Sequence, residues 1–451
     1  MSSSGAAADD EAINIGDDGV DEFEAFFGRF WSELSVFSFD RGREIAEKEK
    51  ERALKKGSSS GFTWVIITTA LAQLSQTEKA YVNLTFLAPK GFLRKDSNLK
   101  SILDSVKLDL KKISESSVTS LPAKHSYPEV AAALLVLINL RLEMMEFYEK
   151  LSLYGSAKNV EISDLITDIE TILENFSEEQ NSIGDSVAIL QGILNSVNWE
   201  LQTMCNLLKV IHAVQTWSYL DATVGIQLAN SNLQEWSELV QSNSTTVRKS
   251  SFYSSTPTLP TLFLWIKKLK GMLISKYTLY FYELLSKHSN SNYDIRNYCT
   301  KLPVDYYSRI SVFQKKSDAL CICIVFDARE TSFYRNGYRF PGREVELVEG
   351  LDSFPSIVSV PAKPVQHWPS IVMIISDKAN ELAADKTVAI FDSRIQVTYF
   401  VHKIDVRMFL LIMYEAKKSE KDAYTLKFLT DLAFELRFGA KIFSSLKCFR
   451  I

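Results

Sequence analysis

The arrangement of hydrophobic and polar positions changes once along this chain, near residue 300. Between residues 23 and 288, apolar side chains recur at steps of three, four and seven, which places them on one face of a helix. After residue 318, short apolar runs are separated by turn-forming residues, as is typical of β-strands. The pattern therefore predicts a helical N-terminal part and a C-terminal part that contains a sheet.

The N-terminal part is predicted to consist of long helices that bury apolar stripes. We expect helices near residues 64–81, 128–153, 162–176, 187–227 with an internal break, and 260–287. A Gly/Ser link is expected at 57–61 and a Ser/Thr-rich loop at 242–255. The clearest stripes are Trp64, Ile67, Leu71, Leu74 and Tyr81; Leu137, Leu140, Met144, Tyr148 and Leu151; and Ile266, Leu269, Leu273, Tyr277, Tyr280 and Leu284.

The C-terminal part is predicted to place strands between helices. Residues 320–326 are apolar on both faces, which indicates a buried strand. Further strands are expected at 356–360, 371–376, 387–392, 396–402 and 408–415, and helices at 305–316, at 424–438 and near Phe443. This order favours an α+β sandwich with an antiparallel or mixed sheet.

Three segments follow from these patterns. Residues 1–22 are small, polar and acidic, and they cannot bury enough apolar surface to offset the entropy of ordering, so we expect a disordered acidic tail. Residues 23–297 form the predicted α-helical bundle domain, and residues 298–451 form the predicted α+β domain. The fold class is therefore multidomain, an all-α bundle followed by an α+β domain.

Composition and charge narrow the class of protein. With 46% hydrophobic residues the chain can bury a large core, and a formal net charge of −4 argues against a general nucleic-acid binder. The five cysteines are scattered, the start has no secretory pattern, and no apolar run reaches the roughly 20 residues that span a bilayer. We expect a cytoplasmic protein whose contact with any membrane is peripheral.

Catalytic chemistry has one candidate constellation in this sequence. Cys321 or Cys323 could act as a nucleophile with His367 or His402 as base and Asp392 as the orienting carboxylate. However, both cysteines lie in the middle of a predicted buried strand, where cysteine behaves as a small apolar residue. We therefore predict no catalytic residue, and a hydrolase or transferase that uses Cys321 or Cys323 with His367 stays an alternative.

Metal and cofactor sites are not indicated by the spacing of possible ligands. Cys321 and Cys323 are too close in sequence for a zinc knuckle, and no two histidines stand three or four positions apart. Phosphate-binding, dinucleotide-binding and EF-hand motifs are missing from the sequence. We expect no cofactor and no metal.

Lysines follow one another on the helix predicted after Pro260. Lys267, Lys268, Lys270 and Lys276 could bind acidic lipid head groups or an acidic partner, which would make the chain a peripheral lipid-binding protein. The simpler interpretation is a solvated helix face beside the apolar stripe.

A proline-rich segment is the second candidate contact surface. Pro361, Pro364 and Pro369 restrict the backbone around His367 and Trp368. An aromatic side chain on a rigid loop suits a protein–protein hot spot, but Trp368 could equally cover the edge of its own sheet. The sequence leaves both alternatives open.

Short stretches in collinear order along the chain resemble the KICSTOR subunit-two family. They run from about residue 23 to residue 447, and their order and breadth make the resemblance specific. The stretches are Thr77-Glu78-Lys79-Ala80-Tyr81, Arg141-Leu142-Glu143-Met144, His367-Trp368-Pro369-Ser370 and Thr398-Tyr399-Phe400, together with 36–40, 47–52, 94–97, 147–150, 263–270, 325–327, 336–338, 354–359 and 417–422.

The resemblance implies a scaffold without catalytic residues. Members of this family help to build KICSTOR with a kaptin-like subunit, an FG-GAP repeat protein and a very large scaffold protein. The complex places the GATOR GTPase-activating complex on lysosomes and restrains TOR signalling when nutrients are scarce. The strands between flanking helices also resemble roadblock/profilin-like modules, which is an analogy of fold alone.

Overall fold

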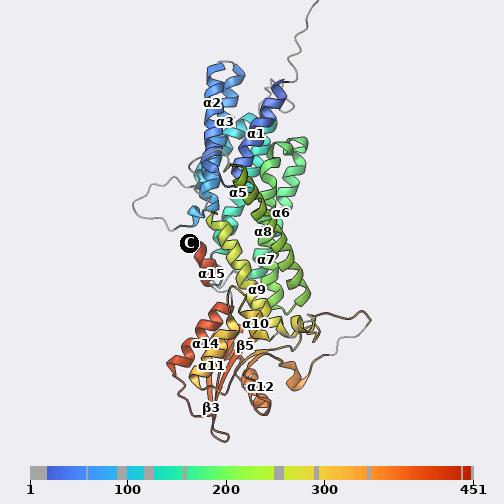
Figure 1. The fold of residues 1–451 in the computed structure, drawn as a ribbon, viewed down its shortest axis with the longest axis vertical. Helices are drawn as coiled ribbons and strands as arrows, with labels where there is room; N and C mark the ends of the chain where they lie inside the picture. The colour runs from blue at the N-terminus through green and yellow to red at the C-terminus, as the bar shows by residue number, and fades with distance from the viewer. Residues whose placement is uncertain are drawn as a thin grey trace, which may run out of the picture.

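The computed structural model of this protein is elongated. A helical bundle lies at one end of its longest axis and a sheet lies at the other (Figure 1). The structure describes residues 18–56, 59–88, 99–115, 126–155, 160–247, 259–288, 294–342, 347–437 and 440–447. The tail at 1–17 and the first two residues of the predicted Gly/Ser link, Gly57 and Ser58, lie outside these ranges. The link is wrong for its last three residues, since α3 begins at Ser59.

Nine long helices in the described residues build the bundle. They are α1 (Asp18–Ser35), α2 (Phe39–Lys56), α3 (Ser59–Val82), α4 (Leu99–Ser114), α5 (Tyr127–Leu151), α6 (Ile162–Ser182), α7 (Gln191–Gln215), α8 (Tyr219–Val247) and α9 (Thr261–His288), with 3-10 turns at Thr85–Leu87 and Gly184–Leu190. Most predicted stripe residues are buried, because each stripe faces the neighbouring helices. The centre of the bundle includes α5, whose residues are buried on nearly every side.

Two boundaries in the bundle differ from the sequence pattern, and the predicted break in the fourth helix is confirmed. Helix α1 begins at Asp18, inside the segment expected to be disordered. The predicted break in the fourth helix is the short turn between α7 and α8, where Trp217 has a positive φ of 62°. The predicted Ser/Thr-rich loop is wrong in its first part, since α8 continues through Val247; residues 248–255 of that loop lie outside the described residues.

The C-terminal part contains one five-stranded sheet with the order β2-β1-β5-β4-β3. All neighbouring strands are antiparallel, which decides between the two predicted kinds of sheet. The elements are α10 (Ile295–Cys299), α11 (Tyr306–Ser317), β1 (Cys321–Phe326), β2 (Ser356–Val360), α12 (Trp368–Asp377), α13 (Ala379–Ala383), β3 (Val388–Asp392), β4 (Val397–Asp405), β5 (Met408–Tyr414), α14 (Ala423–Leu436) and α15 (Ala440–Ser444).

Alternation along β1, which lies between β2 and β5, divides the sheet into two buried faces. Ile322, Ile324 and Phe326 belong to the same core as the bundle and α14, whereas Cys321 and Cys323 face the core beneath α12. Helices therefore cover both faces of the sheet, and the α+β sandwich predicted from the sequence is confirmed.

The strand predicted at 371–376 is wrong, because these residues form helix α12. Its run of isoleucine, valine and methionine is compatible with either state, and periodicity cannot separate a short buried strand from a short buried helix. The buried positions Trp368, Ile371, Ile374 and Ile375 follow helical spacing. Pro369 lies in the first turn, where its missing N–H costs no hydrogen bond.

A single apolar core connects the bundle with the sheet. The Trp217 ring, between α7 and α8, stacks on Phe326 of β1 with 4.9 Å between centroids. The indole N–H of Trp265 in α9 donates to the carbonyl of Ile442 in α15 at 3.0 Å. The division into domains at residue 297 stays a prediction, since buried side chains are continuous across it.

Candidate contact surfaces and buried polar networks

The predicted proline-rich surface consists of the segment between β2 and α12 and the first two residues of α12, Trp368 and Pro369. Pro361 and Pro369 are exposed, and Pro364 and His367 are half-buried. Trp368 is only 3% exposed, and its indole N–H donates to the carbonyl of Phe354 at 3.2 Å. The Trp368 ring is therefore buried in the core beneath α12 and is not itself exposed as an anchor, whereas a role of the surrounding segment in partner contact stays a prediction.

The structure does not pair either candidate nucleophile, Cys321 or Cys323, with a histidine base. Cys321 Sγ lies 3.4 Å from Met413 Sδ, and Cys323 Sγ lies 3.5 Å from Ser359 Oγ. The neighbouring thiol and burial raise the pKa of Cys321, which disfavours the thiolate that a nucleophile needs. Among the hydrogen bonds of the described residues, neither thiol is paired with a histidine.

The histidines and the carboxylate named with these cysteines have other partners. His367 Nδ1 lies 3.1 Å from the hydroxyl of Tyr399. Asp392 ends β3, and its carboxylate accepts from the backbone N–H of Arg394 at 2.9 Å. His402 belongs to a separate cluster near the end of α14, so the structure does not assemble the predicted triad.

The predicted lysine face of α9 is divided by burial. Lys267 and Lys268 are exposed, while Lys270 is half-buried and its ammonium group donates to the side chain of Asn230 at 2.7 Å. Lys276 is 1% exposed, so the expectation of a fourth surface lysine is wrong. Lys276 lies on the side of α9 that faces the sheet, and its ammonium group forms an ion pair with a buried carboxylate.

That carboxylate belongs to Asp405, the last residue of β4. The Lys276 ammonium group lies 2.6 Å from Asp405 Oδ2, and the hydroxyl of Tyr280 donates to the same oxygen at 3.1 Å. Burial lowers the pKa of Lys276, and the charge of Asp405 opposes this change. This ion pair connects α9 of the bundle with the sheet.

A second buried network lies at the centre of the bundle. Arg141 of α5 makes two hydrogen bonds to Glu78 of α3, at 2.7 and 2.9 Å, and one to Glu200 of α7 at 3.0 Å. The hydroxyls of Tyr81 and Tyr148 donate to the other oxygen of Glu200 at 2.5 and 3.1 Å. Burial and the Glu200 carboxylate raise the pKa of both tyrosines, so they remain donors.

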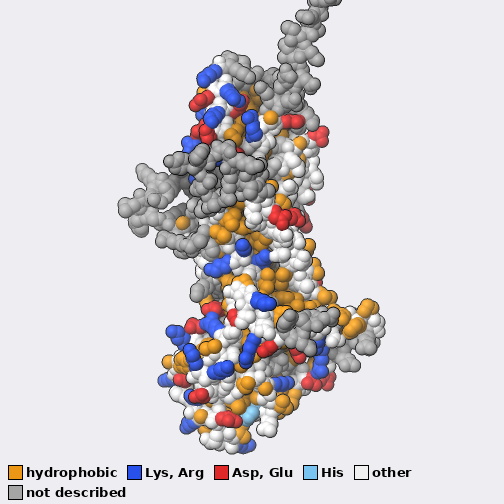
Figure 2. Space-filling view, viewed as in Figure 1, with side chains coloured by type: hydrophobic (Ala, Val, Ile, Leu, Met, Phe, Trp, Pro, Cys, Tyr) orange, Lys and Arg blue, Asp and Glu red, His pale blue; other side chains and the backbone are white. Residues whose placement is uncertain are grey.

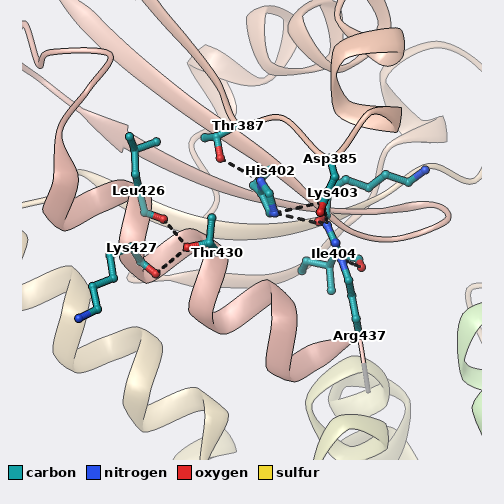
Figure 3. A network of polar contacts seen from close by, with 9 residues as sticks. All are labelled: Asp385, Thr387, His402, Lys403, Ile404, Leu426, Lys427, Thr430 and Arg437. Carbon is teal, nitrogen blue, oxygen red and sulfur yellow. Dashed lines mark hydrogen bonds and ion pairs between the residues drawn. The ribbon is translucent and has the colours of Figure 1, made fainter. Parts of the chain in front are cut away.

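A third polar network connects β4 with the end of α14 (Figure 3). The hydroxyl of Thr387 lies 2.9 Å from His402 Nδ1, and Arg437 Nη2 lies 3.3 Å from His402 Nε2. Arg437 also contacts the Asp385 carboxylate and the carbonyl of Lys403. Because the guanidinium only donates, this geometry fits a neutral imidazole with its proton on Nδ1.

The sequence patterns did not identify these three networks. Glu78, Arg141 and Glu200 stand on otherwise buried helix faces, and such a charged residue inside an apolar stripe is the signal that could have marked them. The pairing of these residues cannot be read from the sequence in the same way, since the partners are 15 to 129 positions apart.

Lowering the pH is expected to destabilise the fold through His402. Burial and the neighbouring Arg437 lower the pKa of His402, and Asp385 opposes them. The unfolded chain therefore binds this proton more readily, so stability is fully present above the unfolded pKa of about 6.5 and is lost as the pH falls below it. Melting temperatures measured across this range should fall less in His402→Gln than in the natural protein.

A matched variant separates this effect from other titrations. His212→Gln changes an exposed histidine of α7 and should keep the pH dependence of the natural protein. Equal pH dependence in both variants and the natural protein would contradict the role given to His402.

The part of the chain that the structure describes contains neither a metal-binding cluster nor a membrane-spanning helix. No group of three or more His, Cys, Asp or Glu side chains there could hold a metal ion. No helix there has both the length and the apolar character needed to cross a membrane.

Comparison with known proteins agrees with the resemblance found in the sequence. A family model described as "KICSTOR complex C12orf66 like" matches residues 17–449, which include the bundle, the sheet and all three polar networks. The chain belongs to this family. Among the KICSTOR relatives, the zebrafish (Danio rerio) protein "KICSTOR subunit 2" is 33% identical over 445 residues, 95% of this chain and 96% of that protein.

A frog relative gives the same result for the KICSTOR family. The Xenopus laevis protein "KICSTOR subunit 2" is 30% identical over 434 residues, 93% of this chain and 95% of that protein. Both relatives are covered almost completely, so the similarity extends over the whole architecture rather than one of its halves.

Proposed function

We propose that this protein is a non-catalytic scaffold subunit of a KICSTOR-like complex. In this role it recruits the GATOR GTPase-activating complex to lysosomes and restrains TOR signalling under nutrient deprivation. The observation that carries the proposal is the family match along residues 17–449, which covers both the bundle and the sheet of this chain. Burial of Cys321 and Cys323 without a histidine partner supports an adaptor rather than a cysteine-dependent enzyme.

The proposed partners are those of the KICSTOR family. They are a kaptin-like subunit, an FG-GAP repeat protein, a very large scaffold protein and, through them, the GATOR complex. The protein would be cytoplasmic and would reach the lysosomal membrane peripherally, through the complex, without binding nucleic acid. A formal charge of −4 spread over 451 residues agrees with protein contacts rather than nucleic-acid binding.

Two surfaces are proposed for partner contact. One consists of the exposed and half-buried residues above Trp368, namely Pro361, Pro364, His367 and Pro369. Trp368 would act from within by holding this loop rigid, since a preorganised loop loses less entropy on binding. The other consists of Lys267 and Lys268 on α9, with Lys270 at its margin.

Affinity purification of the tagged full-length protein from its own cells tests this function. We expect a kaptin-like subunit and an FG-GAP repeat protein to be recovered in near-equal amounts by quantitative mass spectrometry. Recovery of the chain alone, with folded protein confirmed by circular dichroism, would contradict the scaffold function.

Surface variants in the same purification test the two proposed contact surfaces. We chose Val365→Asp, at a 71% exposed position of the proline-rich segment, and the pair Lys267→Glu with Lys268→Glu. At least one of these should reduce partner recovery, whereas the control Lys112→Glu on α4 should not. Unchanged recovery with both would show that partners bind elsewhere.

A further inference from the structure

Helix α8 presents a row of apolar side chains to solvent. Leu220, Val224 and Leu228 are 49%, 56% and 48% exposed, and each follows the one before by four residues. Residues at this spacing lie on one face of a helix and form a ridge along it. Apolar side chains of this size that gather on one exposed face mark a contact with another molecule. These three residues are called the α8 ridge below.

The α8 ridge lies on the part of the bundle that is nearest the sheet. Trp217, just before α8, stacks on Phe326 of β1, and the ridge occupies the first three turns that follow. Figure 2 shows apolar side chains gathered on the surface of the molecule where the bundle meets the sheet. The ridge is therefore part of an apolar area of the surface rather than one isolated side chain.

The inner face of α8 is closely packed against its neighbours. A Cβ atom on Gly225 would lie 2.6 Å from a methyl group of Val210, so the glycine lets α8 and α7 approach each other. On the other side, the hydroxyls of Thr223 and of Tyr277 in α9 are 2.6 Å apart. Helices α7 and α9 therefore hold α8 from within and leave the ridge uncovered.

The helices on this side of the bundle are strongly acidic. Residues 160–247, which include α6, α7 and α8, contain twelve Asp and Glu residues and a single basic one, Lys209. Their formal net charge is therefore −11, whereas the whole chain has −4. Such an asymmetry creates a negative potential over one side of the molecule.

Ion pairs neutralise only part of this charge. Asp168 is paired with Lys150. Glu170 is paired with Lys209, and Glu200 belongs to the buried network at the centre of the bundle. The other nine carboxylates form no ion pair among the described residues; they are Glu161, Asp164, Glu174, Glu178, Glu179, Asp185, Asp221, Glu235 and Glu238.

The two borders of the α8 ridge differ in charge. Glu235 lies toward α7, because its carboxylate accepts from the indole N–H of Trp199 at 3.1 Å. On the opposite border, Lys270 of α9 donates to Asn230 at 2.7 Å, and Lys267 is exposed one turn earlier on the same helix. The ridge therefore has an acidic border toward α7 and α6, and a basic border toward α9.

A basic amphipathic helix fits this face best. Apolar side chains at helical spacing can pack beside the ridge, while lysines and arginines on one flank meet the unpaired carboxylates. Two copies of this protein would bring two sets of these carboxylates together, and an anionic bilayer would be repelled by them. Charge therefore favours a partner of the opposite sign.

We propose that the α8 ridge binds a basic amphipathic helix of a partner protein. The helix lies along Leu220, Val224 and Leu228 and directs its basic flank toward α7. This adds a third contact surface to the proline-rich segment and the lysines of α9. It extends the proposed scaffold function, but its first test uses the isolated chain and does not depend on assembly of the complex.

Fluorescence anisotropy with a synthetic peptide tests this contact on the purified full-length protein. The probe is an amphipathic helix with leucines on one face and lysines on both flanks, and the control peptide has glutamates in place of the lysines. We expect binding of the lysine peptide alone, weakened by salt. Val224→Ser with Leu228→Ser should weaken it at least about tenfold, because two apolar contacts are lost. Glu235→Gln with Glu238→Gln should weaken it about fivefold.

Matched variants elsewhere on the surface make this outcome decisive. Leu108→Ser removes a leucine that is 61% exposed on α4, and Glu51→Gln with Glu415→Gln removes two exposed carboxylates away from α8. Neither should change peptide binding, and thermal unfolding should show that all variants are folded. Equal affinity of the α8 variants and the natural protein for the lysine peptide would overturn the proposal.

Zero-length coupling of carboxylates to amines tests the contact in the purified complex. A carbodiimide should join Glu235 or Glu238 to a lysine of another subunit, as identified by mass spectrometry of the linked peptides. Coupling of these carboxylates to a second copy of the chain alone, or to lysines of the same chain alone, would overturn the proposal. If the chain purifies without partners, the scaffold function fails, and the peptide titration still decides this contact.

Discussion

Replacing Arg141 with methionine is expected to lower the free energy of unfolding by about 3–5 kcal/mol. Arg141 is 4% exposed and is bonded to the carboxylates of Glu78 and Glu200. Without the guanidinium, two carboxylates would remain buried with no positive charge between them. Urea unfolding followed by circular dichroism measures the change, and it should appear as a clear shift of the midpoint.

A variant that removes one of the two carboxylates tests whether unpaired negative charge causes this loss of stability. Glu78→Gln leaves Arg141 paired with Glu200 alone, so the buried group becomes neutral and the loss should be less than half as large. Arg43→Ala breaks an exposed pair within α2 and should cost no more than about 0.5 kcal/mol. A loss from Glu78→Gln that equals the loss from Arg141→Met would contradict the electrostatic explanation.

Lys276→Met is the second change with a large expected effect, again about 3–5 kcal/mol. It leaves Asp405 buried with the hydroxyl of Tyr280 as the one hydrogen-bond partner of its carboxylate among the described residues. Because this pair joins α9 to the end of β4, the damage should concentrate where the bundle meets the sheet. Hydrogen exchange should therefore rise in β4 and β5 more than in α5.

A double variant tests whether the pair is coupled. Lys276→Met with Asp405→Asn removes both charges but keeps an acceptor for Tyr280. Most of the stability lost in Lys276→Met should return, because no unpaired charge stays buried. Simple addition of the two single effects would show that the ion pair does not act as a unit.

Much of the architecture was predictable from local patterns. Helical periodicity placed α5 and α9 within a few residues of their ends, and short apolar runs bounded by turn-forming residues placed β2, β4 and β5. These patterns succeed because side-chain spacing along one element fixes which face is apolar. They failed at α12, where a short continuous run of apolar residues contains no such period.

The candidate surfaces were predictable only in part. The prolines marked the connection after β2, but Trp368 and Pro369 already belong to α12, and the sequence could not show that the Trp368 side chain is buried. Lys276 looked like its neighbours Lys267 and Lys268, since all lie on one helix of mixed polarity. Exposure depends on what packs against each turn, and that information is absent from a single helix.

The sequence by itself determined the two-part architecture, the family and the apolar faces of most helices, since these follow from residue spacing and order. Only the tertiary structure decided which charged side chains are buried together. Arg141 meets Glu78 and Glu200 across 63 and 59 positions, and Lys276 meets Asp405 across 129. Local spacing fixes the face on which a charge lies, but the counter-charge is supplied by whichever distant element the fold places against that face.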